Sequence, residues 1–175
     1  ELSDYPFKSN CDTEVIIAGY LKWGIDCIQK FKGMFAIALF DREKDELFLV
    51  RDRIGKKPLY YWLENGNIVF ASELKPIMAL EDFSFVIRKE VIKQYMFQQY
   101  INAPATIFEN VYKLEPGAIL RFHYGEVKIW KYWDIKEVYR EQAAKPVTSY
   151  EEAKATLKDL LRDAVKKRMI ADVPL

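Results

Sequence analysis

The spacing of apolar side chains changes several times along the chain, and each change marks a predicted element. Residues 12–24 (DTEVIIAGYLKWG) place apolar side chains at helical intervals behind Asp12 and stop at Gly24, a residue typical of helix ends. This pattern predicts a helix whose N-cap is Asp12, since aspartate is among the residues preferred at that position. A shorter helical turn is expected over residues 27–31.

Strand patterns begin after Gly33. The runs MFAIALFD and ELFLV lie on either side of the turn REKD, and LYYWL and IVFAS lie on either side of ENGN. The pair Asn65-Gly66 in the second turn is a strong hairpin signal, because both residue types tolerate positive φ. These runs predict four consecutive antiparallel strands in one sheet with a layer packed against it. The runs VYKL, AILRFHY and VKIWKYWDI then predict a second cluster of strands.

Two helices are expected between the strand clusters, and a linker after them. SELKPIMAL predicts a short helix capped by Ser72, and RKEVIKQYMFQQY predicts a longer helix over residues 88–100. Residues 136–148 are polar and weakly patterned, so we interpret them as a linker.

A helix of about twenty residues is predicted after this linker. Ser149 and Glu152 have the spacing of a capping box. Behind them, one helix face carries an apolar stripe made of Ala153, Leu157, Leu160, Leu161, Ala164, Val165 and Met169. An apolar stripe needs a surface to pack on. We therefore expect residues 149–175 to begin a second domain, of which this chain holds the first helix.

Composition excludes several classes of protein. The chain has 175 residues, of which 50% are hydrophobic, and its 27 basic and 26 acidic side chains nearly cancel. These values indicate a globular protein with no general attraction to nucleic acid or to an anionic membrane. No apolar run approaches the roughly 18 residues of a membrane helix, and the first ten residues lack the pattern of a signal peptide. We expect a cytoplasmic protein.

Few residues suggest chemistry when each is considered alone. Cys11 and Cys27 form neither a disulfide framework nor a zinc spacing, and no histidine is near either in sequence, so we interpret both as core residues. The single histidine, His123, lies in a strand pattern and is interpreted as a strand side chain. For Asp12 a cap is the simplest role. Because a carboxylate has about four acceptor sites, capping is compatible with binding an ammonium group.

The charged stretch RDRIGKKPLYY (residues 51–61) is interpreted as a structural brace. Asp52 interrupts the basic run, and no aromatic stacking pattern accompanies it, which argues against a nucleic-acid site. Gly55 permits a tight reversal, and Pro58 fixes the entry to the next strand. We expect Arg51, Asp52 and Arg53 to form ion pairs across the end of a sheet.

Eight blocks, taken in order, resemble one family: CDTEVI, WG, GMFAIALFD, RDRIGKKPLYY, FASELKPI, PATIF, VYKLEPG and YWD. They look like asparagine synthetase of the glutamine-hydrolysing type, and the resemblance covers essentially the whole chain. The final RMIADVPL resembles the sequence that leads into that family's Ser-Gly-Gly ATP-pyrophosphatase loop. Other class II glutamine amidotransferases share the charged loop, but YWD and DVPL favour the synthetase type.

The resemblance implies an α+β fold. Residues 1–135 would be the later part of an N-terminal-nucleophile glutaminase domain, a sandwich of antiparallel sheets with helices. Residues 136–148 would be the linker, and residues 149–175 the start of a truncated α/β synthetase domain. The parent enzyme would hydrolyse glutamine and pass the ammonia through an internal tunnel. With ATP and Mg it would convert aspartate to asparagine, and a homodimer is an expected assembly.

The resemblance transfers few site residues to this chain. The family's nucleophile is a cysteine at the mature N-terminus, which is absent here, so we expect no catalytic residue and an inactive fragment without bound ATP or Mg. Asp12 matches the aspartate that holds the α-amino group of glutamine, and Met34 matches a residue that lines the tunnel. No metal ligand is expected. Lys56 departs from the family, which usually has an apolar residue there.

Two other functions stay open at this point. The chain could come from a related amidotransferase-ligase that acts on another carboxylate. It could also be a degenerate glutaminase-like module that serves as an interaction domain without catalysis.

Overall fold

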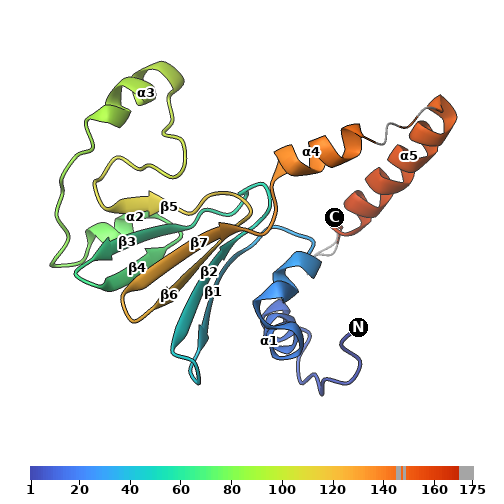
Figure 1. The fold of residues 1–175 in the computed structure, drawn as a ribbon, viewed down its shortest axis with the longest axis horizontal. Helices are drawn as coiled ribbons and strands as arrows, with labels where there is room; N and C mark the ends of the chain where they lie inside the picture. Colours follow the sequence, from blue (N-terminus) through green and yellow to red (C-terminus); the bar gives the residue numbers. More distant parts are fainter. Residues whose placement is uncertain (145–146, 148, 170–175) are drawn as a thin grey trace. The chain divides into compact units, whose positions relative to one another are not determined.

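A computed structural model describes residues 1–144, 147 and 149–169 of the chain. The contacts divide the chain into two compact units, Glu1–Asp134 and Ile135–Leu175, and each is described here by itself. The fold is α+β, with two antiparallel sheets and several helices, as the resemblance implies (Figure 1).

The first unit contains two sheets, a long helix at its N-terminal end and shorter helices. Its helical segments are α1 (Asp12–Trp23), the 3₁₀ helix η1 (Gly24–Lys30), α2 (Leu74–Met78) and α3 (Glu90–Gln98). Its strands are β1 (Ala36–Asp41), β2 (Glu46–Arg51), β3 (Tyr60–Glu64), β4 (Asn67–Ala71), β5 (Val111–Lys113), β6 (Ala118–His123) and β7 (Glu126–Lys131). The helices predicted over residues 12–24 and 88–100 are thereby confirmed.

The four consecutive strands predicted in one sheet are divided between two sheets. One sheet has the order β1-β2-β6-β7, and the other has the order β4-β3-β5. The prediction was wrong because hydrophobic spacing identifies strands but does not decide their partners. Each hairpin was recognised correctly, and the segment between β2 and β3 carries the chain from one sheet to the other. The second predicted cluster is divided in the same way, since β5 pairs with β3 while β6 pairs with β2.

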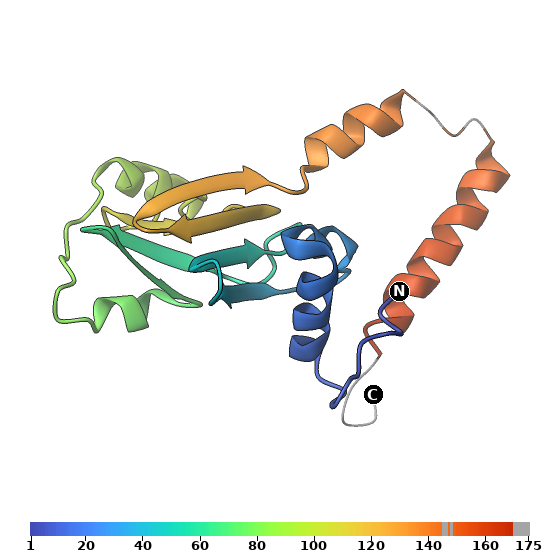
Figure 2. The ribbon, with the colours of Figure 1, turned by 60° about the horizontal axis from the view of Figure 1, so that its bottom comes forward.

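Three clusters of apolar side chains pack the helices and the two sheets into layers. The first packs α1 and η1 on one face of the four-stranded sheet, through residues such as Cys27, Ile28, Ile37, Val50 and Ile119. The second joins the two sheets, through residues such as Leu49, Leu120, Tyr61 and Leu114. The third covers the outer face of the three-stranded sheet with α2 and the segment near Phe83 and Phe108. In Figure 2, α1 (blue) lies beside the four-stranded sheet, away from α2 (green).

Two predicted helix caps differ from the structure. The N-cap of α1 is Cys11, with no side-chain cap bond, and Asp12 is the first helical residue. The N-cap of α2 is Glu73 rather than Ser72, again without a side-chain cap bond. Sequence shows which residue types favour a cap, but the backbone angles of the preceding segment decide where the helix begins.

Turn and strand predictions agree with the structure at two places. Asn65 and Gly66 have φ values of 50° and 74° between β3 and β4, as a hairpin turn of this type requires. His123 ends β6, and its Nδ1 lies 3.1 Å from the carbonyl oxygen of Asp45. It is therefore a strand side chain, as the sequence predicted.

The second unit contains two helices, α4 (Ile135–Ala143) and α5 (Tyr150–Lys166). Most of residues 136–148 lie in the helix α4, and their role as a linker stays a prediction. The lysine, glutamate, arginine, glutamine and alanine residues of α4 are good helix formers, which explains a helix without a strong apolar pattern. The cap of α5 is confirmed, because Ser149 Oγ accepts the amide of Glu152 at 3.3 Å. The assignment of residues 149–175 to a second domain stays a prediction, and residues 170–175 lie outside the described part.

Candidate functional site

The N-terminal end of α1 carries the residue that the sequence analysis assigned to glutamine binding. Asp12 is exposed, and no hydrogen bond or ion pair of its carboxylate is recorded among the residues that the structure describes. Because the cap position belongs to Cys11, the Asp12 carboxylate is not engaged in capping. A carboxylate without a capping bond can accept charge-assisted hydrogen bonds from an ammonium group.

Glu14 closes the chain segment that precedes this helix. Its Oε1 accepts the amide of Lys8 at 2.8 Å, and its Oε2 accepts the amide and the hydroxyl of Ser9 at 2.7 and 2.6 Å. The Ser9 hydroxyl oxygen in turn accepts the amide of Cys11 at 3.3 Å. The bond from the Ser9 hydroxyl is the main cause that lowers the pKa of Glu14. We call these bonds the Glu14 latch.

Met34, the predicted tunnel residue, lies two residues before β1. Its side chain is 50% exposed, so it is not part of the packed core. The next residue, Phe35, packs on the same apolar cluster as Ile16 of α1. No interaction joins Asp12 and Met34 in the described part of the chain, and both assignments stay predictions.

The charged loop after β2 is built around a buried carboxylate. Asp52 is 0% exposed. Its Oδ1 accepts the amide of Lys56 at 2.9 Å, and its Oδ2 accepts the amide of Lys57 at 2.8 Å. Its backbone carbonyl accepts the amides of Gly55 and Gly117, both at 3.0 Å. Asp52 therefore closes the loop on itself and also ties it to the turn before β6.

Arg51 supports the same loop through backbone carbonyls. Its guanidinium donates to the carbonyl oxygens of Lys57 at 2.9 Å, Gly55 at 2.9 Å and Leu114 at 2.7 Å. Gly55 has a φ of 67°, and a Cβ atom there would lie 2.8 Å from Pro116 Cγ and 3.1 Å from Arg51 Cζ. The glycine is thus required both by its backbone angle and by the space that the arginine occupies.

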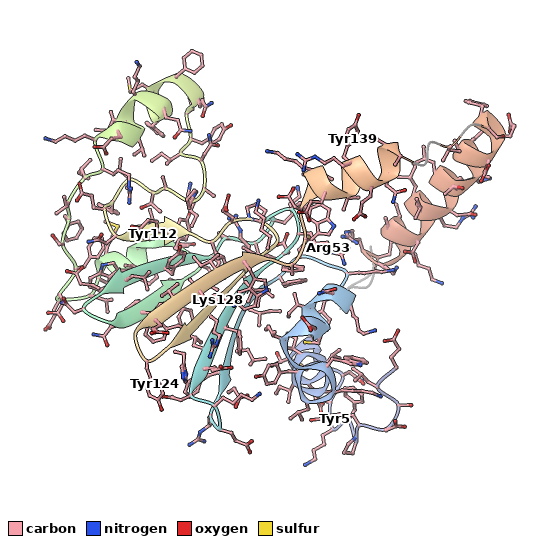
Figure 3. All side chains as sticks on the ribbon, in the orientation of Figure 1. Tyr5, Arg53, Tyr112, Tyr124, Lys128 and Tyr139 are labelled. Atoms are coloured by element: carbon pink, nitrogen blue, oxygen red, sulfur yellow. The ribbon has the colours of Figure 1, made fainter. Side chains whose placement is uncertain are left out.

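The expected ion pairs of this loop are not formed. Arg53 donates to the carbonyl oxygen of Gln29 at 2.9 Å, and none of the ion pairs found in the described residues includes Arg51, Asp52 or Arg53. Figure 3 shows Arg53 at the end of the strands where this loop leaves β2. The interpretation of this stretch as a structural brace was right, but its charged side chains hold the loop through hydrogen bonds to backbone groups. A hydrogen bond with a charged donor or acceptor is stronger than one between neutral groups.

The two cysteines have opposite environments. Cys27 is 0% exposed, and burial raises the pKa of its thiol to about 11. Cys11 is exposed, which corrects its interpretation as a core residue, and hydrogen bonds with Thr13 lower the pKa of its thiol. Cys27 belongs to the first core cluster, within η1, whereas Cys11 is the N-cap residue of α1 and lies outside that cluster.

Other features of the described residues do not add a second site. Within the part of the chain that the structure describes, no group of three or more histidine, cysteine, aspartate or glutamate side chains is arranged to hold a metal ion. No described helix is long and apolar enough to cross a membrane. A cleft of about 780 Å³ borders β3 and β4, lined by residues such as Trp62, Glu64, Asn67 and Asp82, and neither Asp12 nor Met34 lines it.

Sequence reasoning did not find Glu14 as a residue of this site. Its only local signal is its position in the first turn of a helix, where acidic residues are common for electrostatic reasons. A serine and a glutamate five positions apart do not match a capping box, so Ser9 and Glu14 gave no recognisable pattern.

Comparison with known proteins adds to this geometry. The family described as "Glutamine amidotransferase domain" matches residues 1–133. A relative from Methanocaldococcus jannaschii, "Putative asparagine synthetase [glutamine-hydrolyzing] 2", is 36% identical over 172 residues, which cover 96% of this chain and 32% of the relative. "Asparagine synthetase [glutamine-hydrolyzing] 3" of Bacillus subtilis is 30% identical, with coverages of 98% and 27%. "Amidase chry2" of Gibberella zeae is 32% identical, with coverages of 98% and 25%. The chain thus spans about a third or less of the length of these relatives.

Proposed function

The chain belongs to the glutamine amidotransferase domain family, and on this premise we propose that it is part of a glutamine-hydrolysing asparagine synthetase. In the proposed reaction, glutamine is hydrolysed to glutamate and ammonia. The ammonia then displaces AMP from the activated β-carboxylate of aspartate, so that asparagine forms at the expense of ATP.

The observation that carries this proposal is the extent of the similarity to two named synthetases. The family match ends at residue 133, whereas the relatives from M. jannaschii and B. subtilis match over 172 residues each. The similarity therefore continues past the amidotransferase domain into the second unit. The relative named "Amidase chry2" matches over a similar length, so the names of the two synthetases, together with this extent, support the proposal.

Within this proposal, Asp12 holds the α-ammonium group of glutamine. Its exposed carboxylate at the start of α1 is free of a capping bond, and this supports the assignment. Met34, half exposed at the entrance to β1, is proposed to line the path of ammonia. The described residues do not fit a metal site, so no step that involves Mg or ATP is assigned to them.

The substitution Asp12→Asn in the full-length protein that carries this chain tests the role of Asp12. A charge-assisted hydrogen bond contributes roughly 1.5–3 kcal/mol, or ten- to a hundredfold in affinity. Glutamine-dependent asparagine formation should fall by that factor at limiting glutamine, while formation from free ammonia should stay near normal. Asp26→Asn is the control, because Asp26 is also an exposed aspartate, in η1. An unchanged ratio of the two activities would show that Asp12 does not bind glutamine.

Product analysis tests the reaction itself. The full-length protein, supplied with ATP, Mg, aspartate and ammonium, should form asparagine and AMP. Absence of asparagine with release of AMP from another carboxylate would overturn the proposed acceptor.

A second candidate function is amidation of a different carboxylate. It is favoured by the similarity to "Amidase chry2", which is 32% identical over 98% of this chain and thus as similar as the named synthetases. The glutamine half of the reaction would be unchanged, so Asp12→Asn would act in the same way. The acceptor assay separates the two candidates.

A further inference from the structure

We infer that Glu14 is a positioning residue for the glutamine site: the latch that it forms fixes the backbone before α1, so that the Asp12 carboxylate is held ready for the substrate ammonium. This inference rests on the proposed role of Asp12 in glutamine binding. It adds a residue that does not touch glutamine but controls its affinity.

The contacts of Glu14 reach back over the whole turn before the helix. Both carboxylate oxygens are used, one for Lys8 and the other for Ser9, at distances of 2.6 to 2.8 Å. Ser9 relays the contact to the amide of Cys11, the residue directly before Asp12. Two consecutive hydrogen bonds, Glu14 to Ser9 and Ser9 to Cys11, therefore connect the Glu14 carboxylate to the point where the helix begins.

These bonds differ from those of an ordinary capping box. In that motif, a glutamate in the first turn bonds to the amide of the N-cap residue. Here the N-cap residue is Cys11, and its amide bonds to Ser9, while Glu14 reaches residues two and three positions further back. The carboxylate thus orders the preceding segment as well as the helix end. A glutamate that only stabilised the helix would not need these contacts.

Helix geometry separates the roles of the two carboxylates. Residues two positions apart on an α-helix are about 200° apart around its axis. Glu14 points to the preceding segment and is half-buried by it, whereas Asp12 lies on the other side of the helix and is exposed. The latch therefore fixes the backbone without occupying the group that would meet the ammonium. A group that contacts a substrate must be held within about 0.5 Å of its productive position. Loss of the latch should therefore weaken substrate binding.

The functional test measures glutamine kinetics in the full-length protein. Glu14→Ala should raise the KM for glutamine roughly tenfold, since small misplacements of a binding group are costly. The kcat at saturating glutamine and the rate with free ammonia should change little. Glu14→Gln keeps one acceptor oxygen and should show a smaller rise. Glu43→Ala is the control, because Glu43 is an exposed glutamate in the turn between β1 and β2, and it should leave all these constants unchanged.

A structural test uses this chain without any catalysis. Hydrogen–deuterium exchange should show that the amides of Lys8 and Ser9 are protected, and that Glu14→Ala removes this protection. Ser9→Ala removes only the hydroxyl contacts and should give partial effects in both tests. If Glu14→Ala lowers the ammonia-dependent rate through general unfolding, the effect of Ser9→Ala on the KM for glutamine decides whether the latch positions Asp12.

These experiments distinguish a failure of the positioning role of Glu14 from a failure of the glutamine-binding role of Asp12. If Asp12→Asn lowers glutamine affinity but neither Glu14→Ala nor Ser9→Ala changes it, the positioning role is wrong and the role of Asp12 stands. If Asp12→Asn has no effect, the glutamine-binding role of Asp12 itself is wrong. If exchange shows Lys8 and Ser9 unprotected in the unaltered chain, the latch does not exist in solution and the inference is overturned.

Discussion

The backbone carbonyl of Asp52 accepts a hydrogen bond from the amide of Gly117 at 3.0 Å. This bond joins the loop that leaves β2 to the turn that enters β6, two segments far apart in sequence whose strands are neighbours in the four-stranded sheet. Gly117 in turn accepts the amide of Tyr132 at 2.8 Å, so the end of β7 is tied to the same point. The charged stretch after β2 is therefore a brace at one end of the sheet.

Gly117→Ala should destabilise the chain strongly. Gly117 has a φ of 67°, and an added Cβ would lie 2.3 Å from the carbonyl oxygen of Trp133. The left-handed conformation costs a side chain about 1–2 kcal/mol, and overpacking adds about 1–3 kcal/mol. Urea unfolding monitored by tryptophan fluorescence measures the loss.

Two other glycines separate the causes. Gly66 has a φ of 74° with no atom within 4 Å of an added Cβ, so Gly66→Ala should show the conformational cost alone. Gly33 has neither a positive φ nor a close neighbour, so Gly33→Ala should be nearly neutral. Equal losses for Gly117→Ala and Gly66→Ala would contradict the steric part of the argument.

Asp52→Asn should also lower stability, although its shape is almost unchanged. The aspartate uses both carboxylate oxygens to accept backbone amides, and an asparagine replaces one of them with a donor. Leaving one of the two amides that face the buried Asp52 side chain unpaired costs about 1–3 kcal/mol. The urea midpoint should fall at constant slope, whereas Asp26→Asn, at an exposed aspartate, should leave it unchanged.

The chain should lose stability in acid when Asp41 becomes protonated. A hydrogen bond from the Tyr20 hydroxyl at 2.7 Å, followed by contacts with Lys44, lowers the pKa of Asp41 to about 2. The pKa of Asp41 in the folded chain lies below the usual value of 3.8. The ionised carboxylate therefore stabilises the folded state above pH 3.8, and this stabilisation is lost as the pH falls through about 2. Thermal midpoints between pH 2 and 7 should therefore fall less steeply for Asp41→Asn. Parallel curves for the two proteins would contradict this.

The thiols should react at very different rates. Cys11 is exposed with a lowered pKa, whereas burial raises the pKa of Cys27 to about 11. Thiolate is the reactive form, so an aromatic disulfide reagent at pH 8 should label one thiol quickly in the folded chain. The second should react only in denaturant. Cys11→Ser should abolish the fast phase, and a fast phase that persists in this variant would show that Cys27 is accessible.

The sequence of this chain determined its local elements. Helical spacing behind residue 12 and the glycine at position 24 gave α1, and the Asn65-Gly66 pair gave the hairpin of β3 and β4. These features depend on near neighbours, because side-chain periodicity and positive φ are properties of a few consecutive residues. The family resemblance, carried by short ordered blocks, was readable for the same reason.

Tertiary structure alone decided the pairing of strands and the contacts of the charged groups. β2 pairs with β6 rather than β3, and its two faces pack against α1 on one side and the second sheet on the other. Arg51 reaches the carbonyl of Leu114, and the carbonyl of Asp52 reaches the amide of Gly117, because folding brings these distant segments together. The Glu14 latch likewise exists only where the segment before the helix turns back. Each of these relationships depends on distance in space, which the spacing of residues along a chain does not fix.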